Sequence, residues 1–188
     1  GDYGRQMTWP IVEDTSLLFL HCNRGKRSIV LDLRTEEGVQ AFKELAADAD
    51  VVVEAMRPGA LARRGLGYED LKAINPKIVF MTISGYGMTG PYRDLPSHGI
   101  AYDTWAGIIE PAYDEEGYCY IPPHISIGIN AGPMFGALGI LAGIIKARAT
   151  GEGCYMEIAQ SDAAAAFDWY RSESFKAYER PQSEVTGN

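Results

Sequence analysis

The sequence predicts an α/β protein with a Rossmann-like parallel sheet and helices on both of its faces, followed by helical segments. Between positions 28 and 83, short apolar runs rich in β-branched residues alternate with segments of helical periodicity. Strands buried in a parallel sheet have this composition. From about position 99 onward, long apolar or Ala-rich stretches of helical length predominate. A content of 46% hydrophobic and 22% charged residues is that of an ordinary globular chain.

Three apolar runs are expected to form buried strands: Ser28–Leu33, Asp50–Glu54 and Lys77–Ile83. A helix is expected between the first two, because Thr35 suits an N-cap and apolar residues follow at helical spacing as far as Ala49. Between the second and third runs, Pro58-Gly59 breaks the chain. Two short helices, at 60–64 and 68–74, are expected after this break.

The second half of the chain is expected to contain a short helix near Ile100–Ile109, an irregular stretch through Pro123, a long apolar helix, a strand at Cys154–Ile158 and a final helix from Asp162 to about Tyr178. The long apolar segment contains 21 residues without a charge, Ile125–Ile145, which is long enough to imitate a membrane span. Asn130 and Pro133 look like a helix start, so the helix is expected to run from about Ala131 to Arg148. We interpret it as a helix buried in a soluble core.

The charge balance argues against nonspecific binding to nucleic acid or to anionic membranes. The chain has 17 Lys+Arg against 25 Asp+Glu, a net charge of −8. An anionic ligand must therefore be held by local basic clusters, which are Arg24/Lys26/Arg27, Arg34 and Arg57/Arg63/Arg64. Arg34 and Arg57 directly follow expected strands, where open α/β sheets place their ligands. Any one arginine is more simply a solvated surface residue, but the repetition at successive turns predicts a phosphorylated ligand.

The cysteines predict no metal site and no disulfide framework. Cys22, Cys119 and Cys154 are far apart and odd in number, and no CxxC or Cys/His ligand spacing occurs. Reduced cysteines and the lack of a signal-peptide pattern lead us to expect a cytoplasmic protein.

The segment Gly85–Gly90 spells GxGxxG directly after an expected strand. In a dinucleotide-binding unit the third glycine leads into a helix, but Pro91 and Pro96 interrupt that helix here. A glycine loop that acts as a lid over a site explains the pattern better than a nicotinamide or flavin site.

Candidate acid–base groups lie close together at His98 and Asp103, the second on an expected helix. On spacing alone, such a pair is more often structural than catalytic. His124 has no partner that the sequence identifies.

Four stretches of the chain resemble the class III CoA-transferase family, which groups formyl-CoA and carnitine-type CoA-transferases with α-methylacyl-CoA racemases. They are NRGKRSIVLDLRTEEG, ADVVVEAMRPGALARRGLGYEDL, NPKIVFMTISGYGMTGP and GALGILAGIIKARATGEG. The resemblance runs from about Gly1 to Asp162. It implies one domain, with a CoA-binding α/β portion at 1–98 and a mostly helical portion at 99–188. It also implies that the N- and C-terminal parts of a longer, interlocked homodimer are missing here.

The resemblance further implies that coenzyme A or an acyl-CoA is the substrate, with a carboxylic acid as acceptor and no metal. The positions that match the CoA contacts of the family are Leu31, Arg34, Ala60 and Arg63. Gly85 and Gly87 match a glycine loop that covers the acyl thioester.

The reaction is left open by one departure from the family pattern. The resemblance implies an aspartate nucleophile at the start of the long helix, which forms mixed anhydrides with the acyl group. The matching positions here are Gly128, Ile129 and Asn130, none of which is an acid. Asp103 is then the nearest carboxylate for a CoA-transferase. The alternatives are an acyl-CoA racemase or isomerase that uses His98, and a non-catalytic CoA-binding subunit.

Overall fold

The computed structural model describes residues 2–7, 10–13 and 15–169. The chain divides into two compact units, with the boundary between Asp32 and Leu33. The first unit contains η1 (Tyr3–Arg5), the antiparallel strands β1 (Pro10–Val12) and β2 (Thr15–Ser16), and helix α1 (Leu17–Asn23). The buried Ser16 ties this unit together, since its hydroxyl donates to the carbonyl of Gly4 (2.6 Å) and accepts from the N–H of Phe19 (3.1 Å).

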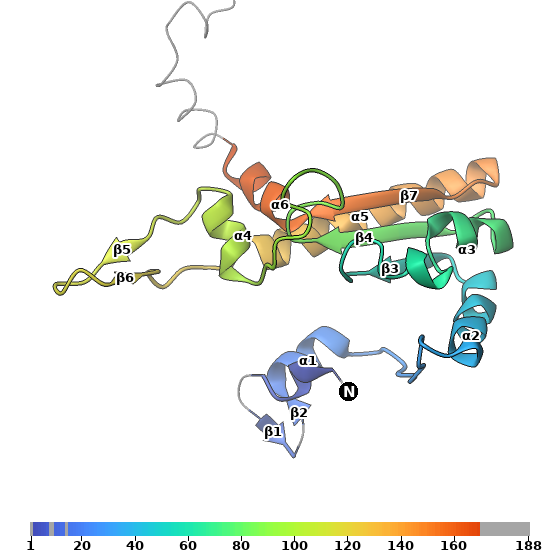
Figure 1. Cartoon of the computed structure of the whole chain (residues 1–188), viewed down its shortest axis with the longest axis horizontal. Coiled ribbons are helices and arrows are strands. Elements are labelled where there is room, and N and C mark those ends of the chain that lie inside the picture. Colours follow the sequence, from blue (N-terminus) through green and yellow to red (C-terminus); the bar gives the residue numbers. More distant parts are fainter. Residues whose placement is uncertain (1, 8–9, 14, 170–188) are drawn as a thin grey trace, which may run out of the picture. The chain divides into compact units, whose positions relative to one another are not determined.

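The second unit is built on a parallel sheet in the order β3–β4–β7 (Figure 1). Its strands are β3 (Val51–Glu54), β4 (Val79–Ser84) and β7 (Cys154–Ala159). The register places Glu54 opposite Thr82, and Thr82 opposite Glu157. These three side chains therefore form one row near the carboxyl ends of the strands.

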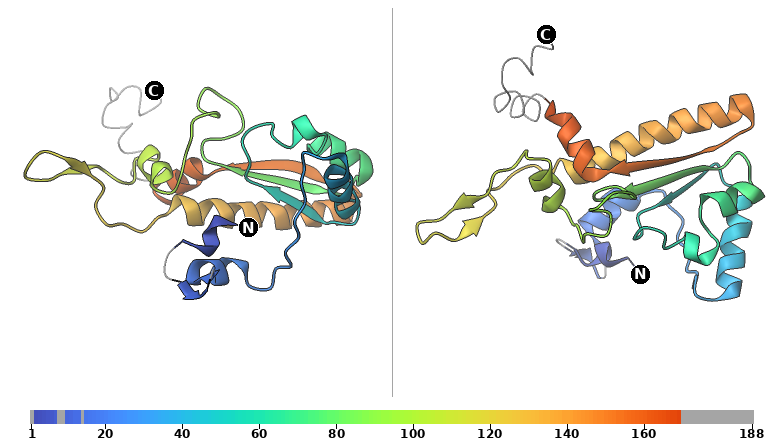
Figure 2. Two further views of the ribbon diagram at one scale, coloured as in Figure 1. Left: turned by 60° about the horizontal axis from the view of Figure 1, so that its bottom comes forward. Right: turned by 45° about the horizontal axis from the view of Figure 1, so that its top comes forward.

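One face of the sheet is covered by helix α5 (Gly128–Thr150), which lies along β4 and β7 in both views of Figure 2. Glycines of α5 face the sheet at close range. A Cβ at Gly139 would lie 3.2 Å from the Cε of Met81, and one at Gly143 would lie 3.0 Å from side-chain carbons of Val79 and Met156. The helix backbone thus takes the place that side chains occupy in ordinary helix–sheet packing.

The opposite face is covered by α2 (Glu36–Ala47), η2 (Ala62–Arg64) and α3 (Tyr68–Ile74). Their apolar side chains enclose the main core, in which Leu66, Leu71 and Ile78 are fully buried. The side-chain amide of Asn75 donates to the carbonyls of Ala46 (3.1 Å) and Ala49 (2.9 Å). This pair of hydrogen bonds joins the end of α2 to the end of α3.

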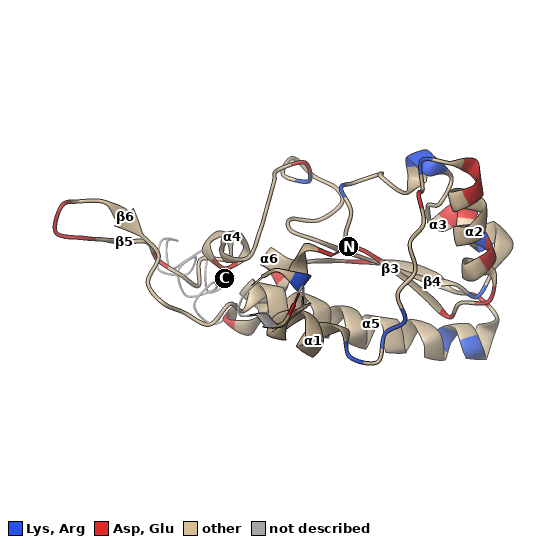
Figure 3. Cartoon of the chain, turned by 90° about the horizontal axis from the view of Figure 1, so that it is seen from below, with Lys and Arg blue, Asp and Glu red and all other residues tan. Residues whose placement is uncertain are grey.

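The remaining elements are α4 (Ile100–Trp105), the antiparallel pair β5 (Ala112–Tyr113) and β6 (Cys119–Tyr120), and α6 (Gln160–Phe167). Figure 3 shows acidic residues at the tip of the β5–β6 hairpin. The stretch through Pro123, expected to be irregular, thus contains a hairpin, and Gly117, with φ of 87°, supplies a turn conformation typical of glycine.

The predicted fold class is confirmed, because a parallel sheet with helices on both faces is present. Helix α2 begins as expected, with the Thr35 hydroxyl accepting from the N–H of Gly38 at 3.1 Å. The predicted strand at Ser28–Leu33 is wrong. Among the described residues no strand pairs with this segment, and Ile29 and Val30 are 65% and 93% exposed. An apolar β-branched run forms a strand only where a neighbour completes its hydrogen bonds.

Helix boundaries also differ from expectation. Helix α5 begins at Gly128, three residues before the predicted start, because a side chain from α4 caps it. Helix α4 ends at Trp105 rather than at Ile109. Helix α6 spans Gln160–Phe167, and the predicted extension over 170–178 lies outside the described residues. The predicted division of the chain at position 98 stays a prediction.

Helix α5 is apolar and long enough to cross a membrane by length and composition, and it is the one such helix in the described part of the chain. Its buried face is the glycine face described above. The opposite face exposes Met134, Leu138, Leu141 and Ile145, each by more than half. The predicted burial of this helix therefore holds for one face only.

Replacing Gly153 tests how closely β7 approaches the chain before β4. A Cβ at Gly153 would overlap the carbonyl oxygen of Ile78, and the N–H of Gly153 donates to the carbonyl of Pro76 at 2.8 Å. We expect Gly153→Ala to lower the free energy of unfolding by about 2 kcal/mol or more, because a backbone atom cannot move aside. Urea unfolding of the full-length protein measures this. Gly139→Ala is the matched control, since it meets only flexible methionine side chains and should stay within about 1 kcal/mol. Equal losses in the two variants would contradict the packing described.

Candidate functional site

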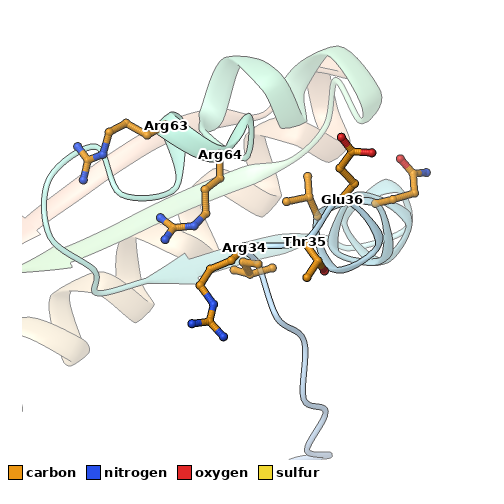
Figure 4. A pocket seen from close by; sticks show the side chains of 8 residues that line it. Arg34, Thr35, Glu36, Arg63 and Arg64 are labelled. Atoms are coloured by element: carbon orange, nitrogen blue, oxygen red, sulfur yellow. The ribbon is translucent and has the colours of Figure 1, made fainter.

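Three arginines converge on one pocket at the start of α2 (Figure 4). The pocket has a volume of about 590 Å³. Its lining, here called the arginine pocket, consists of Leu33, Arg34, Thr35, Glu36, Val39, Gln40, Arg63 and Arg64. Arg34 directly precedes the N-cap of α2, and the other two arginines come from η2. Figure 4 shows the three guanidinium groups on the same side of the pocket.

The local backbone fixes the two arginines of η2. Gly65 ends this short helix in the left-handed conformation, with φ of 67°. Arg63 donates from Nη1 to the carbonyl of Pro58 (3.2 Å), and Arg64 donates from Nη1 to the carbonyl of Ala60 (2.9 Å). Each guanidinium is thus partly oriented and retains further N–H donors, which suit phosphate oxygens.

A second pocket of about 440 Å³ lies at the carboxyl ends of the strands. We call it the strand-end pocket. Arg63 lines it as well as the arginine pocket, so the two meet at this side chain. It is further lined by the Glu54–Thr82–Glu157 row, by Ala60, and by Met88 and Thr89 of the glycine loop.

The structure brings together some of the predicted ligand contacts and not others. Arg34, Ala60 and Arg63 line the two adjoining pockets. Leu31 belongs to the first unit, as do Arg24, Lys26 and Arg27, which are exposed; their contribution to a ligand site stays a prediction. Arg57 is exposed and lines neither pocket.

The glycine loop is anchored at its base. Gly85 fits tightly, because a Cβ there would overlap the hydroxyl of Ser97, and its carbonyl accepts from the N–H of Ser161 at 3.1 Å. Gly87 adopts φ of 93° and donates its N–H to the hydroxyl of Ser84 at 2.9 Å. The role of Gly85 and Gly87 in covering a thioester stays a prediction.

Aromatic rings hold the rest of the loop against α4. Tyr86 and Tyr92 both pack on Trp105, with ring centroids 5.0 and 4.7 Å away. Burial raises the pKa of Tyr86, and the nearby hydroxyl of Tyr102 raises it further. Tyr86 therefore stays protonated and neutral near pH 7.

Asp103 is a fully buried carboxylate that caps the N-terminus of α5. Its Oδ1 accepts from the N–H of Gly128 at 2.6 Å, and its Oδ2 accepts from the N–H of Ile127 at 3.0 Å. The unpaired N–H groups at the start of a helix carry partial positive charge, so a carboxylate is stabilised there. Two backbone donors explain how a charged group tolerates complete burial.

His124 completes this cluster, which the sequence did not reveal. Its Nε2 lies 3.5 Å from Oδ2 of Asp103, and its Nδ1 lies 3.1 Å from the carbonyl of Pro122. The imidazole is 21% exposed and covers the buried carboxylate. Only the fold could reveal this pair, because an irregular segment and the β5–β6 hairpin separate the two residues. His98 lies two residues before α4, where its residue is exposed and its carbonyl accepts from the N–H of Ala101.

Position 128 has no room for the acidic side chain that the family resemblance led us to look for. A Cβ at Gly128 would lie 2.6 Å from the Cβ of Tyr102 and 3.1 Å from Oδ1 of Asp103. The Asp103 carboxylate therefore fills the space that a side chain at 128 would enter. Ile129 and Asn130 are exposed, and the Asn130 amide donates to the carbonyl of Ser126. No group of three metal-ligating side chains occurs among residues 2–7, 10–13 and 15–169.

Fold and site together define an α/β protein with an arginine-lined pocket beside the pocket at its strand ends, and a buried carboxylate at a helix N-terminus. A family model described as CoA-transferase family III matches residues 1–188, and the chain belongs to this family.

Curated relatives are themselves named as CoA-transferases. The chain is 35% identical to the succinyl-CoA–L-malate CoA-transferase beta subunit of Chloroflexus aurantiacus, over 85% of this chain and 39% of that protein. It is 37% identical to the succinyl-CoA:glutarate CoA-transferase of Mus musculus, over 84% of this chain and 36% of that protein. The chain thus spans less than half the length of these relatives.

Solved structures show the same fold. A hypothetical protein (Rv3272) from Mycobacterium tuberculosis matches with a TM-score of 0.81 and 31% identity, over 97% of this chain and 50% of that one. A CaiB/BaiF family protein from Brucella suis matches with a TM-score of 0.82 and 31% identity, over 96% of this chain and 48% of that one.

Replacing Asp103 by Asn tests the cap of α5. We expect a loss of about 2 kcal/mol in the free energy of unfolding, because an amide has one acceptor oxygen for two buried N–H groups and lacks the charge that the helix end stabilises. Thermal or urea unfolding of the full-length protein measures this. Asp162→Asn is the matched control, since Asp162 is exposed in the first turn of α6 and should cost less than about 0.5 kcal/mol. Similar losses in both variants would show that the cap contributes little.

Proposed function

We propose that the full protein is an acyl-CoA-dependent enzyme that transfers CoA between carboxylic acids through covalent acyl- and CoA-enzyme intermediates. Its family membership and the names of its relatives support this reaction class. The observation that carries the proposal is the position of the Asp103 carboxylate. It lies at the N-terminus of α5, where the resemblance places a nucleophile, and position 128 cannot hold one.

In the proposed reaction, Asp103 attacks the thioester carbonyl and forms a mixed acyl anhydride, with CoA thiolate as the leaving group. The thiolate then attacks the aspartyl carbonyl of the anhydride, which releases the donor acid and leaves CoA as a thioester on Asp103. The carboxylate of the acceptor acid attacks this thioester and forms a second anhydride. Attack by the thiolate on the acceptor's acyl carbon yields the new acyl-CoA and restores the carboxylate, so atoms and charge balance over the cycle.

The geometry adds one requirement. Asp103 is completely buried, and both of its oxygens accept from the helix backbone. An attack on a thioester therefore requires the segment that carries His124 to move aside. The N–H groups of Ile127 and Gly128 would remain near the reacting carbon and stabilise the negative charge that develops there.

The arginine pocket is the proposed site of the phosphates of CoA. Arg34, Arg63 and Arg64 offer convergent guanidinium groups, and the N-terminus of the 12-residue helix α2 adds partial positive charge.

We also retain the proposals that the full protein is a homodimer, that it resides in the cytoplasm, and that it binds neither nucleic acid nor membranes.

A second candidate function is CoA binding without turnover, as a partner subunit. The hydrogen bonds that occupy both oxygens of Asp103 favour it, since a cap with no free oxygen is a poor nucleophile in the described state. A racemase that uses His98 is the remaining alternative.

Trapping of the anhydride tests the proposed reaction. Full-length protein that turns over an acyl-CoA in the presence of hydroxylamine should acquire a hydroxamate at Asp103, which peptide mass spectrometry locates. Oxygen-18 from a labelled acceptor acid should also appear in the Asp103 carboxylate of the wild-type protein, a readout that needs no variant. Asp103→Asn should lose both signals, and the control Asp162→Asn should keep them.

The alternatives give different results in the same samples. Tight CoA binding with no hydroxamate, no label and no transfer across a panel of acids would favour the non-catalytic subunit. Deuterium uptake at the α-carbon without an acceptor acid would favour the racemase.

Removal of the pocket arginines tests the CoA site independently of the reaction. We expect Arg34→Ala and Arg63→Ala each to weaken CoA binding by roughly 10- to 100-fold, because a charge-assisted hydrogen bond contributes about 1.5–3 kcal/mol. Isothermal titration calorimetry measures the dissociation constants. Arg148→Ala removes an exposed arginine from the last turn of α5 and serves as the matched control. Unchanged affinity in both pocket variants would exclude the arginine pocket as the phosphate site.

A further inference from the structure

A network of hydrogen-bonded side chains crosses all three strands on the floor of the strand-end pocket. Thr82 Oγ1 donates to Glu54 Oε1 at 2.8 Å, and the Tyr155 hydroxyl donates to Glu157 Oε2 at 3.0 Å. Thr82 is 1% exposed, so this polar group is built into the sheet. The four side chains (Glu54, Thr82, Tyr155 and Glu157) are called the strand-end network below.

One hydrogen-bond acceptor of the network, Oε1 of Glu157, is not used within the network and lies at the pocket. Both oxygens of Glu54 are engaged, since Oε2 accepts from the N–H of Met56 at 2.7 Å. Glu157 uses Oε2 for Tyr155, and no donor to its Oε1 is found within the described ranges 2–7, 10–13 and 15–169. That oxygen lies 4.0 Å from the place of a Cβ on Gly87, under the glycine loop.

Tyr155 acts as a donor in this network. Burial raises the pKa of Tyr155; the Thr82 hydroxyl lowers it, while the Glu157 and Glu54 carboxylates raise it again. The phenol therefore stays protonated near pH 7 and donates its proton to Glu157. This bond fixes the direction of the Glu157 carboxylate.

The negative charge of Glu54 and Glu157 determines which chemical groups of a ligand can bind in the strand-end pocket. Two carboxylates disfavour the phosphates or a second carboxylate of a ligand, because like charges brought together without water are costly. They favour an uncharged group that donates N–H or O–H hydrogen bonds. The pocket joins the arginine pocket at Arg63 and is roofed by Met88 and Thr89 of the glycine loop. A ligand with phosphates at the arginines can therefore extend over the network.

We propose that the strand-end network is a recognition site for the uncharged pantetheine arm of CoA, with Glu157 Oε1 accepting one of its amide N–H groups. This inference rests on the proposed binding of CoA phosphates in the arginine pocket. The network then distinguishes a ligand that carries the pantetheine arm from a bare nucleotide, because only the former has an arm that reaches it.

Two ligands, CoA and adenosine 3′,5′-bisphosphate, separate this site from the phosphate site. Calorimetric titration of the full-length protein should show that Glu157→Gln weakens CoA about tenfold, since an amide oxygen accepts more weakly than a carboxylate, while the bisphosphate binds within twofold of wild type. Tyr155→Phe should weaken CoA by a smaller factor and again spare the bisphosphate. Glu152→Gln changes an exposed glutamate just before β7 and should alter neither. Unfolding midpoints show that the variants are folded.

The outcomes separate the two proposals. Equal CoA affinity in Glu157→Gln and wild type, or an equal loss for both ligands, overturns the strand-end site and leaves the arginine pocket standing. Absence of binding of either ligand to the wild-type protein overturns the proposed function and this inference together.

Discussion

Helix α5 can lie against the sheet only because its inner face is built of glycine. A Cβ at Gly143 would lie 3.0 Å from Val79 and Met156, and one at Gly139 would contact two methionine side chains, so residues larger than alanine would push the helix outward. The start of the helix packs equally closely, with Gly128 against Tyr102 of α4 and the carbonyl of Gln160 at the start of α6. Asp103 can then reach the first N–H groups of α5. The buried carboxylate is therefore a consequence of how the helix packs on the sheet.

Two adjoining pockets carry opposite charges, and their order matches the order of chemical groups along CoA, the proposed ligand. Three arginines form the first pocket, two glutamates lie on the floor of the next, and they share Arg63 at their junction. The glycine loop roofs the second pocket and packs through Tyr86 and Tyr92 on α4, which also carries Asp103. Phosphates, an uncharged amide-containing arm and a reactive thioester follow one another in CoA. The same loop therefore connects the proposed site of the arm to the helix that carries Asp103.

The sequence predicted most of the sheet and its helices, because short apolar runs and helical periodicity record burial directly. It was wrong at Ser28–Leu33, since a strand also needs a partner, and composition says nothing about partners. Arg34, Ala60 and Arg63, which the sequence selected as ligand contacts, line two adjoining pockets, and their role in binding stays a prediction. The sequence missed the pair of Asp103 and His124, and the row of Glu54, Thr82 and Glu157. Those groupings arise from a hairpin and from strand register, which local sequence does not record.

The lack of an acid at the start of α5 does not by itself remove a carboxylate from that place. What the helix N-terminus stabilises is negative charge near its first N–H groups, whichever residue supplies it. With Tyr102 only 2.6 Å from a Cβ at 128, a side chain from α5 and the Asp103 carboxylate compete for one space. Asp103 fills it here at the cost of complete burial, so any chemistry at this carboxylate depends on the movement of the segment that His124 occupies.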